Sequence, residues 1–172
     1  MAAPFTKDEY HQRLATVRAA MADQQLDALL VGDPANMNWL TGFDAWSFCV
    51  PQVMLVTHDA EPIWMGRAMD AGAVSLTTWL AESSVMPYPE NCVQHAGTHP
   101  LAIVAGYLCD LGLQSMRIGY ESDTLFFSPK SLQYLQRGVA DAVWVDADLL
   151  VNWCRLVKSD AEVAMMRQAP VW

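Results

Sequence analysis

Aromatic and short polar side chains alternate over residues 33–48, which read DPANMNWLTGFDAWSF. The segment follows an apolar run at residues 26–31 that is typical of a buried strand, and Pro34 ends that strand because it has no N–H to donate. Aromatic rings interleaved with short polar groups are typical of a binding site or an interface, where one edge is apolar and another is wet. The alternative is a helical turn and loop that pack against the sheet edge and contribute only stability.

Residues able to hold a metal or activate water are few and scattered. His95 and His99 have the spacing of two ligands on a helix, but Gly97 and Pro100 place them in a loop, where solvated histidines are the ordinary case. Neither a Gly-x-Ser-x-Gly nucleophile motif nor a Gly-rich phosphate loop is present. Glu121 could act at the carboxyl end of a strand, although a surface carboxylate is the favoured interpretation. We therefore predict no catalytic residue, no metal site and no cofactor within this chain.

The composition is that of an apolar and acidic chain. Of the 172 residues, 53% are hydrophobic and the mean hydropathy is +0.13, which excludes a disordered chain. This apolar content indicates either an extra apolar face for another domain or subunit, or simply a well-filled core. The net charge is −9 and Lys and Arg do not cluster, which disfavours nucleic-acid partners and anionic membrane surfaces.

Signals for export and membrane insertion are not found in the sequence. The first residues do not form a basic region followed by an apolar one, and no uninterrupted apolar run approaches the roughly 18 residues of a membrane span. Four cysteines occur without a Cys-x-x-Cys pair, so we expect buried free thiols rather than disulfides. These features predict a cytoplasmic protein without a membrane partner.

Hydrophobic spacing predicts alternating strands and helices. A capping box formed by Thr6 and Glu9 starts the first helix. The apolar residues of this helix recur at helical spacing, namely Tyr10, Leu14, Val17 and Met21. Strands are expected at about residues 27–32, 50–57, 62–66, 85–86, 118–120 and 143–145. Helices are expected at about residues 35–41, 69–80, 100–111 and 129–138, and from 149 onward.

Three details of these elements are predicted more closely. Pro87 is expected to break the chain after the short strand at residues 85–86, and Leu111 to complete the buried face of its helix. Trp153 and Leu156 are expected to face inward from the last helix. Because hairpins and crossovers both occur, the elements predict an α/β fold, a three-layer sandwich with a mixed β-sheet flanked by helices.

The sequence also resembles a known family along most of its length. The stretches that carry the resemblance are residues 26–56, 61–70, 118–121 and 152–162, the last reading NWCRLVKSDAE. They are similar to the amino-terminal domain of the creatinase/prolidase (pita-bread metallohydrolase) family. Within that family their sequence is most similar to that of ectoine hydrolases. The resemblance covers nearly all of this chain but only the first of the two domains of the family.

The resemblance implies a particular domain organisation. Residues 1–158 would form the N-terminal domain, and residues 159–172 would begin the linker helix to a C-terminal pita-bread domain that this chain lacks. The family keeps its catalytic or metal-binding carboxylates and histidines in that second domain, where a divalent metal is expected. The first domain helps to form a homodimer and lends residues to the rim of the partner's active site.

The resemblance also implies which residues approach the substrate. By position in the family, these are in the segment with Asp44, Trp46 and Phe48. Ectoine is a small zwitterion with a delocalised amidinium, so Trp46 is expected to hold it by cation–π attraction. Arg67 is expected to pair with its carboxylate. The ordinary alternatives are core or interface packing for the two aromatic residues and a surface charge for Arg67.

The implied function is that of a non-catalytic domain for dimerisation and for the active-site rim of an ectoine-hydrolase-like enzyme, which opens a cyclic amidine by hydrolysis. Two alternatives stay open: the N-terminal domain of an Xaa-Pro peptidase or creatinase, and a stand-alone module for dimerisation or small-molecule binding. A downstream Asp, Asp, His, Glu, Glu set would indicate a dinuclear metallopeptidase. Its partial replacement would favour creatinase-like chemistry.

Overall fold

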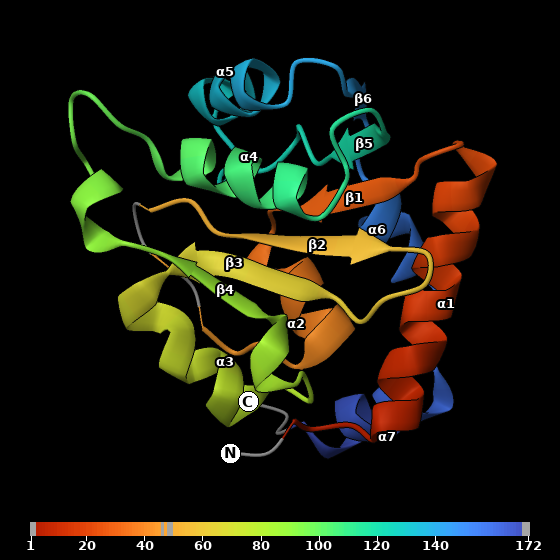
Figure 1. The fold of residues 1–172 in the computed structure, drawn as a ribbon. Helices are drawn as coiled ribbons and strands as arrows, with labels where there is room; N and C mark the ends of the chain where they lie inside the picture. Colours follow the sequence, from red (N-terminus) through yellow and green to blue (C-terminus); the bar gives the residue numbers. More distant parts are fainter. Residues whose placement is uncertain (1–2, 46, 48–49, 170–172) are drawn as a thin grey trace.

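A six-stranded mixed sheet forms the centre of the computed structural model, which describes residues 3–45, 47 and 50–169 (Figure 1). The strands are β1 (Ala28–Val31), β2 (Val53–Thr57), β3 (Ile63–Arg67), β4 (Val85–Tyr88), β5 (Arg117–Tyr120) and β6 (Val143–Asp146). Their order in the sheet is β4-β3-β2-β1-β5-β6. Strand β2 is antiparallel to both its neighbours, whereas the β3–β4, β1–β5 and β5–β6 pairs are parallel.

Helices cover both faces of this sheet. The α-helices are α1 (Lys7–Asp23), α2 (Pro34–Thr41), α3 (Ala71–Thr77), α4 (Pro100–Asp110), α5 (Pro129–Gly138), α6 (Leu150–Cys154) and α7 (Asp160–Gln168). Short 3₁₀ turns are η1 (Ala68–Asp70), η2 (Glu82–Ser84) and η3 (Glu90–Cys92). Helices α1, α2, α3 and α6 enclose one core against the sheet, and α4 and α5 enclose the other. The predicted three-layer α/β sandwich with a mixed sheet is therefore confirmed.

The first helix buries the side chains that its sequence pattern predicts. Tyr10, Leu14, Val17 and Met21 are all buried against the sheet. Thr6 caps the helix by accepting a hydrogen bond from the Glu9 amide at 3.3 Å. The Glu9 carboxylate does not complete the predicted capping box, because it accepts from Arg13 Nε and Ser159 Oγ instead. The helix is thus capped at one end and tied through Glu9 to a residue far along the chain.

Strand β4 corrects one prediction. It continues through Pro87 to Tyr88 rather than ending at residue 86. Because β4 lies at the edge of the sheet, Pro87 needs no N–H for a second neighbouring strand, and a proline is tolerated there. The Pro87 carbonyl accepts a hydrogen bond from the Tyr107 hydroxyl of α4 at 2.8 Å.

The end of the domain exposes side chains that were expected to be buried. Leu150 and Val151 of α6 are buried, but Trp153 is 67% exposed and Leu156 is 60% exposed. Helix α6 ends at Cys154, so the helical spacing that would turn Leu156 inward does not continue. Leu111 follows the end of α4 and is 41% exposed for the same reason. These three predictions are wrong.

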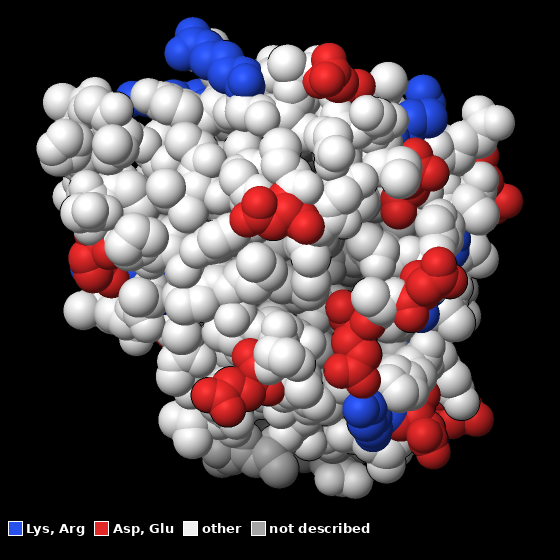
Figure 2. All heavy atoms as spheres, in the orientation of Figure 1, with Lys and Arg blue, Asp and Glu red and all other residues white. Residues whose placement is uncertain are grey.

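Charged side chains are scattered over the face that Figure 2 shows. Carboxylates lie at separate points among uncharged atoms, and the Lys and Arg side chains stand apart from one another rather than forming a patch. No helix in the described part of the chain combines the length and the hydropathy needed to cross a membrane.

Candidate functional site

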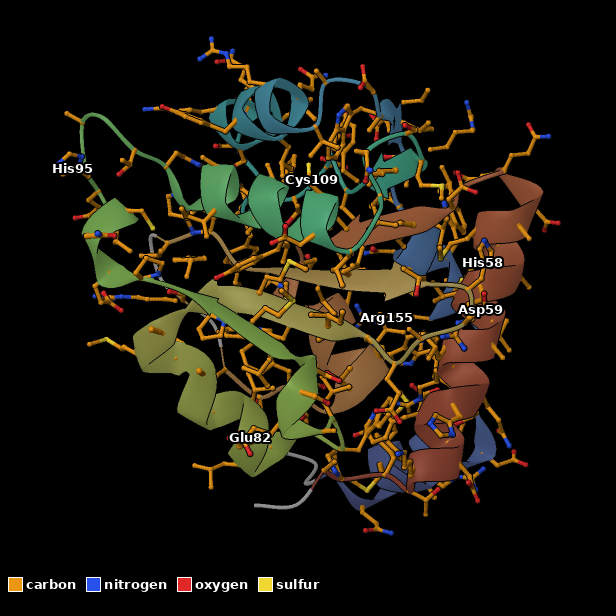
Figure 3. All side chains as sticks on the ribbon, in the orientation of Figure 1. His58, Asp59, Glu82, His95, Cys109 and Arg155 are labelled. Atoms are coloured by element: carbon orange, nitrogen blue, oxygen red, sulfur yellow. The ribbon has the colours of Figure 1, made fainter. Side chains whose placement is uncertain are left out.

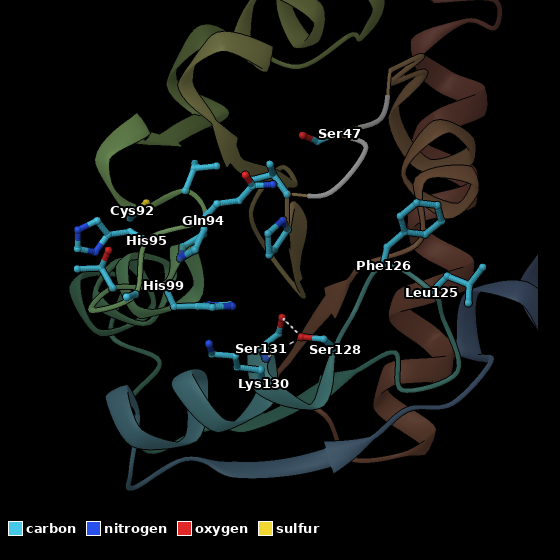
Figure 4. A pocket seen from close by; sticks show the side chains of 16 residues that line it. Ser47, Cys92, Gln94, His95, His99, Leu125, Phe126, Ser128, Lys130 and Ser131 are labelled. Atoms are coloured by element: carbon cyan, nitrogen blue, oxygen red, sulfur yellow. Dashed lines mark hydrogen bonds between the residues drawn. The ribbon is translucent and has the colours of Figure 1, made fainter.

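Five of the six strands point the same way, so their carboxyl ends lie along the same side of the sheet, called here its carboxyl edge. Strands β1, β5 and β6 run in one direction, β2 runs against them, and β3 and β4 again run with β1. The loops that follow β4 and β5 therefore leave the sheet at a common edge, which is where α/β proteins place their ligand sites. A pocket of about 960 Å³ lies there, lined by residues 47, 50 and 51 and by residues within 92–100 and 125–131 (Figure 4).

Polar side chains of this pocket come from the first turns of two helices and from Ser47 and the loop before α4. His99 caps α4, and its Nδ1 accepts from the Leu101 amide at 3.1 Å while its ring stacks on Tyr134 at 4.6 Å. Ser128 caps α5, and its hydroxyl accepts from the Ser131 amide at 3.1 Å and shares a 3.0 Å hydrogen bond with the Ser131 hydroxyl. Both helix starts are as the sequence predicts.

Electrostatics keep His99 neutral near pH 7. Burial lowers the pKa of His99, and the positive charge of Lys130 lowers it further. Since Nδ1 accepts a hydrogen bond, the proton of the neutral ring is on Nε2. Figure 4 shows Lys130 close to His99 at one end of the pocket. The pocket thus contains the cation of Lys130 beside a neutral imidazole that is a hydrogen-bond donor.

Glu121 is buried beneath this edge, which corrects its interpretation as a surface carboxylate. Its side chain lies at the end of β5 and the residue is 3% exposed. Oε2 accepts from the Gly32 amide at 2.8 Å and the Asp33 amide at 2.9 Å, and Oε1 accepts from Asn36 Nδ2 at 2.6 Å. Burial raises the pKa of Glu121 to about 7 even though these three donors favour the ionised form. The carboxylate fastens the start of α2 to the end of β5.

Asn36 extends this buried network to the end of the domain. Its Nδ2 also donates to Asn152 Oδ1 at 2.8 Å, and its Oδ1 accepts from Arg155 Nη1 at 2.6 Å. Arg155 lies just after α6, behind the sheet in the view of Figure 3. One chain of hydrogen bonds therefore joins β5, α2 and the segment that leads into α7.

Helix α7 is held against the body of the domain by charged and polar groups. The capping box of Ser159 and Glu162 is complete, as the sequence predicts. Glu162 Oε1 also accepts from Trp39 Nε1 at 2.7 Å and lies 3.5 Å from Arg13 Nη2. Burial alone would raise the pKa of Glu162, but its hydrogen bonds from Ser159 and Trp39 and the charge of Arg13 lower it. The first turn of α7 is thus held against α1 and α2 by these contacts.

The residues predicted to approach substrate are placed as follows. Trp46 and Phe48 lie outside the described residues. Asp44 is exposed, and its amide donates to Thr77 Oγ1 at 3.2 Å. Arg67 is held by an ion pair to Glu90, with 2.7 Å between Nε and Oε2, and this pairing raises the pKa of Arg67. Neither Asp44 nor Arg67 is among the described residues that line the pocket, so their roles stay predictions.

A cluster of side chains able to bind a metal ion is not found in the part of the chain that the structure describes. There, no group of three or more His, Cys, Asp and Glu side chains is arranged to hold a metal ion. His95 is exposed in its loop, far from the sheet in Figure 3, and its Nδ1 accepts from the Gly97 amide at 3.1 Å. His99 is engaged as the cap of α4.

Comparison with known proteins identifies the architecture. The Creatinase/Prolidase N-terminal domain family matches residues 13–157. Over 167 residues the chain is 43% identical to the ectoine hydrolase of Halomonas elongata, a match that covers 96% of this chain and 42% of that protein.

Two solved structures show the same fold. An Xaa-Pro dipeptidase from Bacillus anthracis aligns with a TM-score of 0.69 at 20% identity, covering 93% of this chain and 39% of that one. A proline dipeptidase from Streptococcus pneumoniae aligns with a TM-score of 0.67 at 21% identity, covering 84% of this chain and 98% of that one.

Because the family match spans most of its residues, this chain belongs to the creatinase/prolidase family and forms the N-terminal domain of that family. The predicted resemblance is confirmed, including its similarity to an ectoine hydrolase. The chain spans about two fifths of the length of the curated relatives that it matches.

Proposed function

We propose that this chain is the dimerisation and active-site rim domain of a cytoplasmic hydrolase that opens a cyclic amidine such as ectoine by adding water across a C–N bond. The observation that carries this proposal is the 43% identity to an ectoine hydrolase along 96% of the chain. The catalytic carboxylates and histidines, and any divalent metal, are assigned to a C-terminal pita-bread domain outside this sequence. The domain itself contributes no group that activates water.

The rim role fits the position of described residues between α2 and β2. Gly42 adopts a left-handed conformation (φ +83°) at the end of α2, and Ser47, Val50 and Pro51, which follow it in the sequence, line the pocket. Trp46 belongs to this stretch and is the proposed cation–π contact for the amidinium of the substrate. Arg67 would bind the substrate carboxylate by exchanging Glu90 for it, since its Nε is now paired with Glu90.

Two other functions remain as alternatives. The first is the N-terminal domain of an Xaa-Pro peptidase or creatinase, supported by the fold that the chain shares with dipeptidases. The second is a module that forms dimers or binds small molecules without catalysis, supported by the exposed Trp153, Leu156 and Val157 near the end of the domain. An assay of the complete two-domain protein on ectoine, creatine and an Xaa-Pro dipeptide separates these possibilities.

The same assay tests the rim residue directly. In the two-domain enzyme, Trp46→Ala should reduce kcat/KM for ectoine by roughly two- to thirtyfold, which corresponds to about 0.5–2 kcal/mol, because the cation–π face is lost. Trp46→Phe should recover much of this loss, and thermal unfolding should be nearly unchanged. A variant that is strongly destabilised while its folded fraction keeps a normal kcat/KM would contradict the role.

The isolated chain provides a second test. The purified 172-residue chain should turn over none of the three substrates above a buffer blank, and light scattering should show a dimer. Turnover that disappears on mutation of a residue within this chain would overturn the assignment of catalysis to the other domain. A monomer at all concentrations from about 1 μM to 1 mM would contradict the dimerisation role.

A further inference from the structure

The pocket at the carboxyl edge of the sheet has the dimensions and lining of a small-molecule site. Its volume of about 960 Å³ is close to the upper end of the usual range for such sites, roughly 300–1,000 Å³. Much of the wall is apolar and includes Val50, Pro51, Val93 and Pro100. Polar groups at the helix starts are His99, Ser128, Lys130 and Ser131, and further polar side chains come from Ser47 and the loop before α4. A ligand that places a polar end at the helix starts and an apolar body against the apolar wall would fit this pocket.

The sign of the charge in the pocket is opposite to that of the whole chain. Lys130 is a lining residue, and no Asp or Glu occurs among the described residues that line the pocket, although the chain carries a net charge of −9. Within the described part of the chain, no carboxylate lies within ion-pair distance of Lys130. A free cation at a pocket wall without acidic neighbours favours an anionic ligand.

Two helices add positive potential at the same place. Helix α4 has 11 residues and α5 has 10, and the first turn of each forms part of the pocket wall. The partial positive charge at a helix N-terminus attracts an anion. Between these two turns, His99 and Lys130 are close enough for the lysine to disfavour the charged imidazole. An anion between them would relieve that repulsion.

The neighbouring hydroxyls are fixed in place. Ser131 is 1% exposed, and its hydroxyl is joined to that of Ser128 by the hydrogen bond drawn in Figure 4. One of the two hydroxyl hydrogens is committed to this bond, which leaves the other free to donate into the pocket. The pocket therefore offers an ammonium, a hydroxyl donor and the Nε2–H of His99.

We propose that this pocket binds a small organic carboxylate with an apolar body, whose carboxylate lies between Lys130, His99 and the first turns of α4 and α5. The site is formed entirely by this chain and does not depend on the proposed hydrolase activity. Its occupant is distinguished by one negative charge and by an apolar part about the size of a leucine side chain or larger.

Binding to the purified 172-residue chain tests the proposal with two probes of equal size. N-acetyl-leucine carries a carboxylate, and N-acetyl-leucinamide replaces it with a neutral amide. NMR titration should show the carboxylate binding with a Kd of about 1 mM or tighter, at least about tenfold more tightly than the amide, with shifts concentrated in residues 92–100 and 126–131. Equal binding of the two probes, shifts elsewhere, or no binding at about 10 mM would overturn the proposal.

A matched pair of lysine variants assigns the charge. Lys130→Gln should bring the preference for the carboxylate below about threefold, because the charged donor is lost. Lys158→Gln removes the same charge from an exposed position in the segment before α7, and it should leave the preference unchanged. Lys130 is exposed, so its replacement should not impair folding, and matching far-UV spectra would verify this. A preference that survives in Lys130→Gln, or falls equally in both variants, would refute the assignment.

Discussion

Replacing Glu121 with glutamine should make the stability of this domain less dependent on pH. Burial raises the pKa of Glu121 from 4.5 to about 7 in the folded protein. A carboxyl group with a higher pKa in the folded than in the unfolded state binds its proton more tightly when folded, so the folded state is penalised as the pH rises. The penalty is absent below pH 4.5, grows between the two pKa values and is complete above pH 7.

The size of this effect follows from the two pKa values. The complete penalty is about 3 kcal/mol, and about 2–3 kcal/mol of it develops between pH 5 and pH 8. Glutamine cannot ionise and lacks this dependence. It would also place an NH₂ group against Asn36 Nδ2, which now donates to Glu121, at a cost of about 1–3 kcal/mol. The variant should therefore be less stable than the wild type at pH 5 and should approach or exceed it at pH 8.

Urea unfolding followed by tryptophan fluorescence at several pH values measures this difference. Subtracting the variant from the wild type removes the contributions of other titrating groups such as Glu162. Glu82→Gln is the matched control, because Glu82 is exposed on η2 (Figure 3), and its curve should run parallel to that of the wild type. A difference between the wild type and Glu121→Gln that stays constant within about 0.5 kcal/mol from pH 5 to pH 8, or favours the wild type more at high pH, would refute the reasoning.

Two further substitutions test other buried polar groups. Gln52 is 3% exposed, and neither Oε1 nor Nε2 has a hydrogen-bond partner in the described structure, so Gln52→Met should raise the free energy of unfolding by about 1–2 kcal/mol. A loss of stability in urea would contradict this. Trp39→Phe removes the donor to Glu162 and should cost about 1–2 kcal/mol while speeding proteolytic cleavage near residues 155–160. An unchanged cleavage rate would mean that this hydrogen bond does not hold α7 in place.

The sequence predicts the elements well where their signals are local. Pro100 and Pro129 mark the starts of α4 and α5, and the Ser159–Glu162 capping box marks the start of α7, because each signal acts within one helical turn. The burial of Glu121 could not be read in this way. It depends on the pairing of β5 with β1, which brings the Gly32 amide to a carboxylate 89 residues away.

The candidate pocket was missed for a related reason. His99 and Lys130 are each ordinary near a helix start, and it is the packing of α4 beside α5 on one face of the sheet that brings them to one pocket. One weak signal exists in the sequence, namely that both helices begin with proline at the end of a strand-to-helix connection. Whether the N-termini of α4 and α5 lie close together depends on the order of the strands in the sheet. No local sequence pattern specifies that order.

The outer edge of β4 limits how copies of this domain can join. An edge strand with free N–H and C=O groups invites another chain to extend the sheet. At Pro87 the donor is missing and the carbonyl is already occupied by the Tyr107 hydroxyl, so an added strand would find neither group available there. A two-fold assembly that continued the sheet through β4 would leave its central hydrogen bonds unmade. Pairing of two copies through β4 is therefore disfavoured relative to the helix-covered faces or the opposite edge at β6, and the same proline discourages fibrous aggregation along β4.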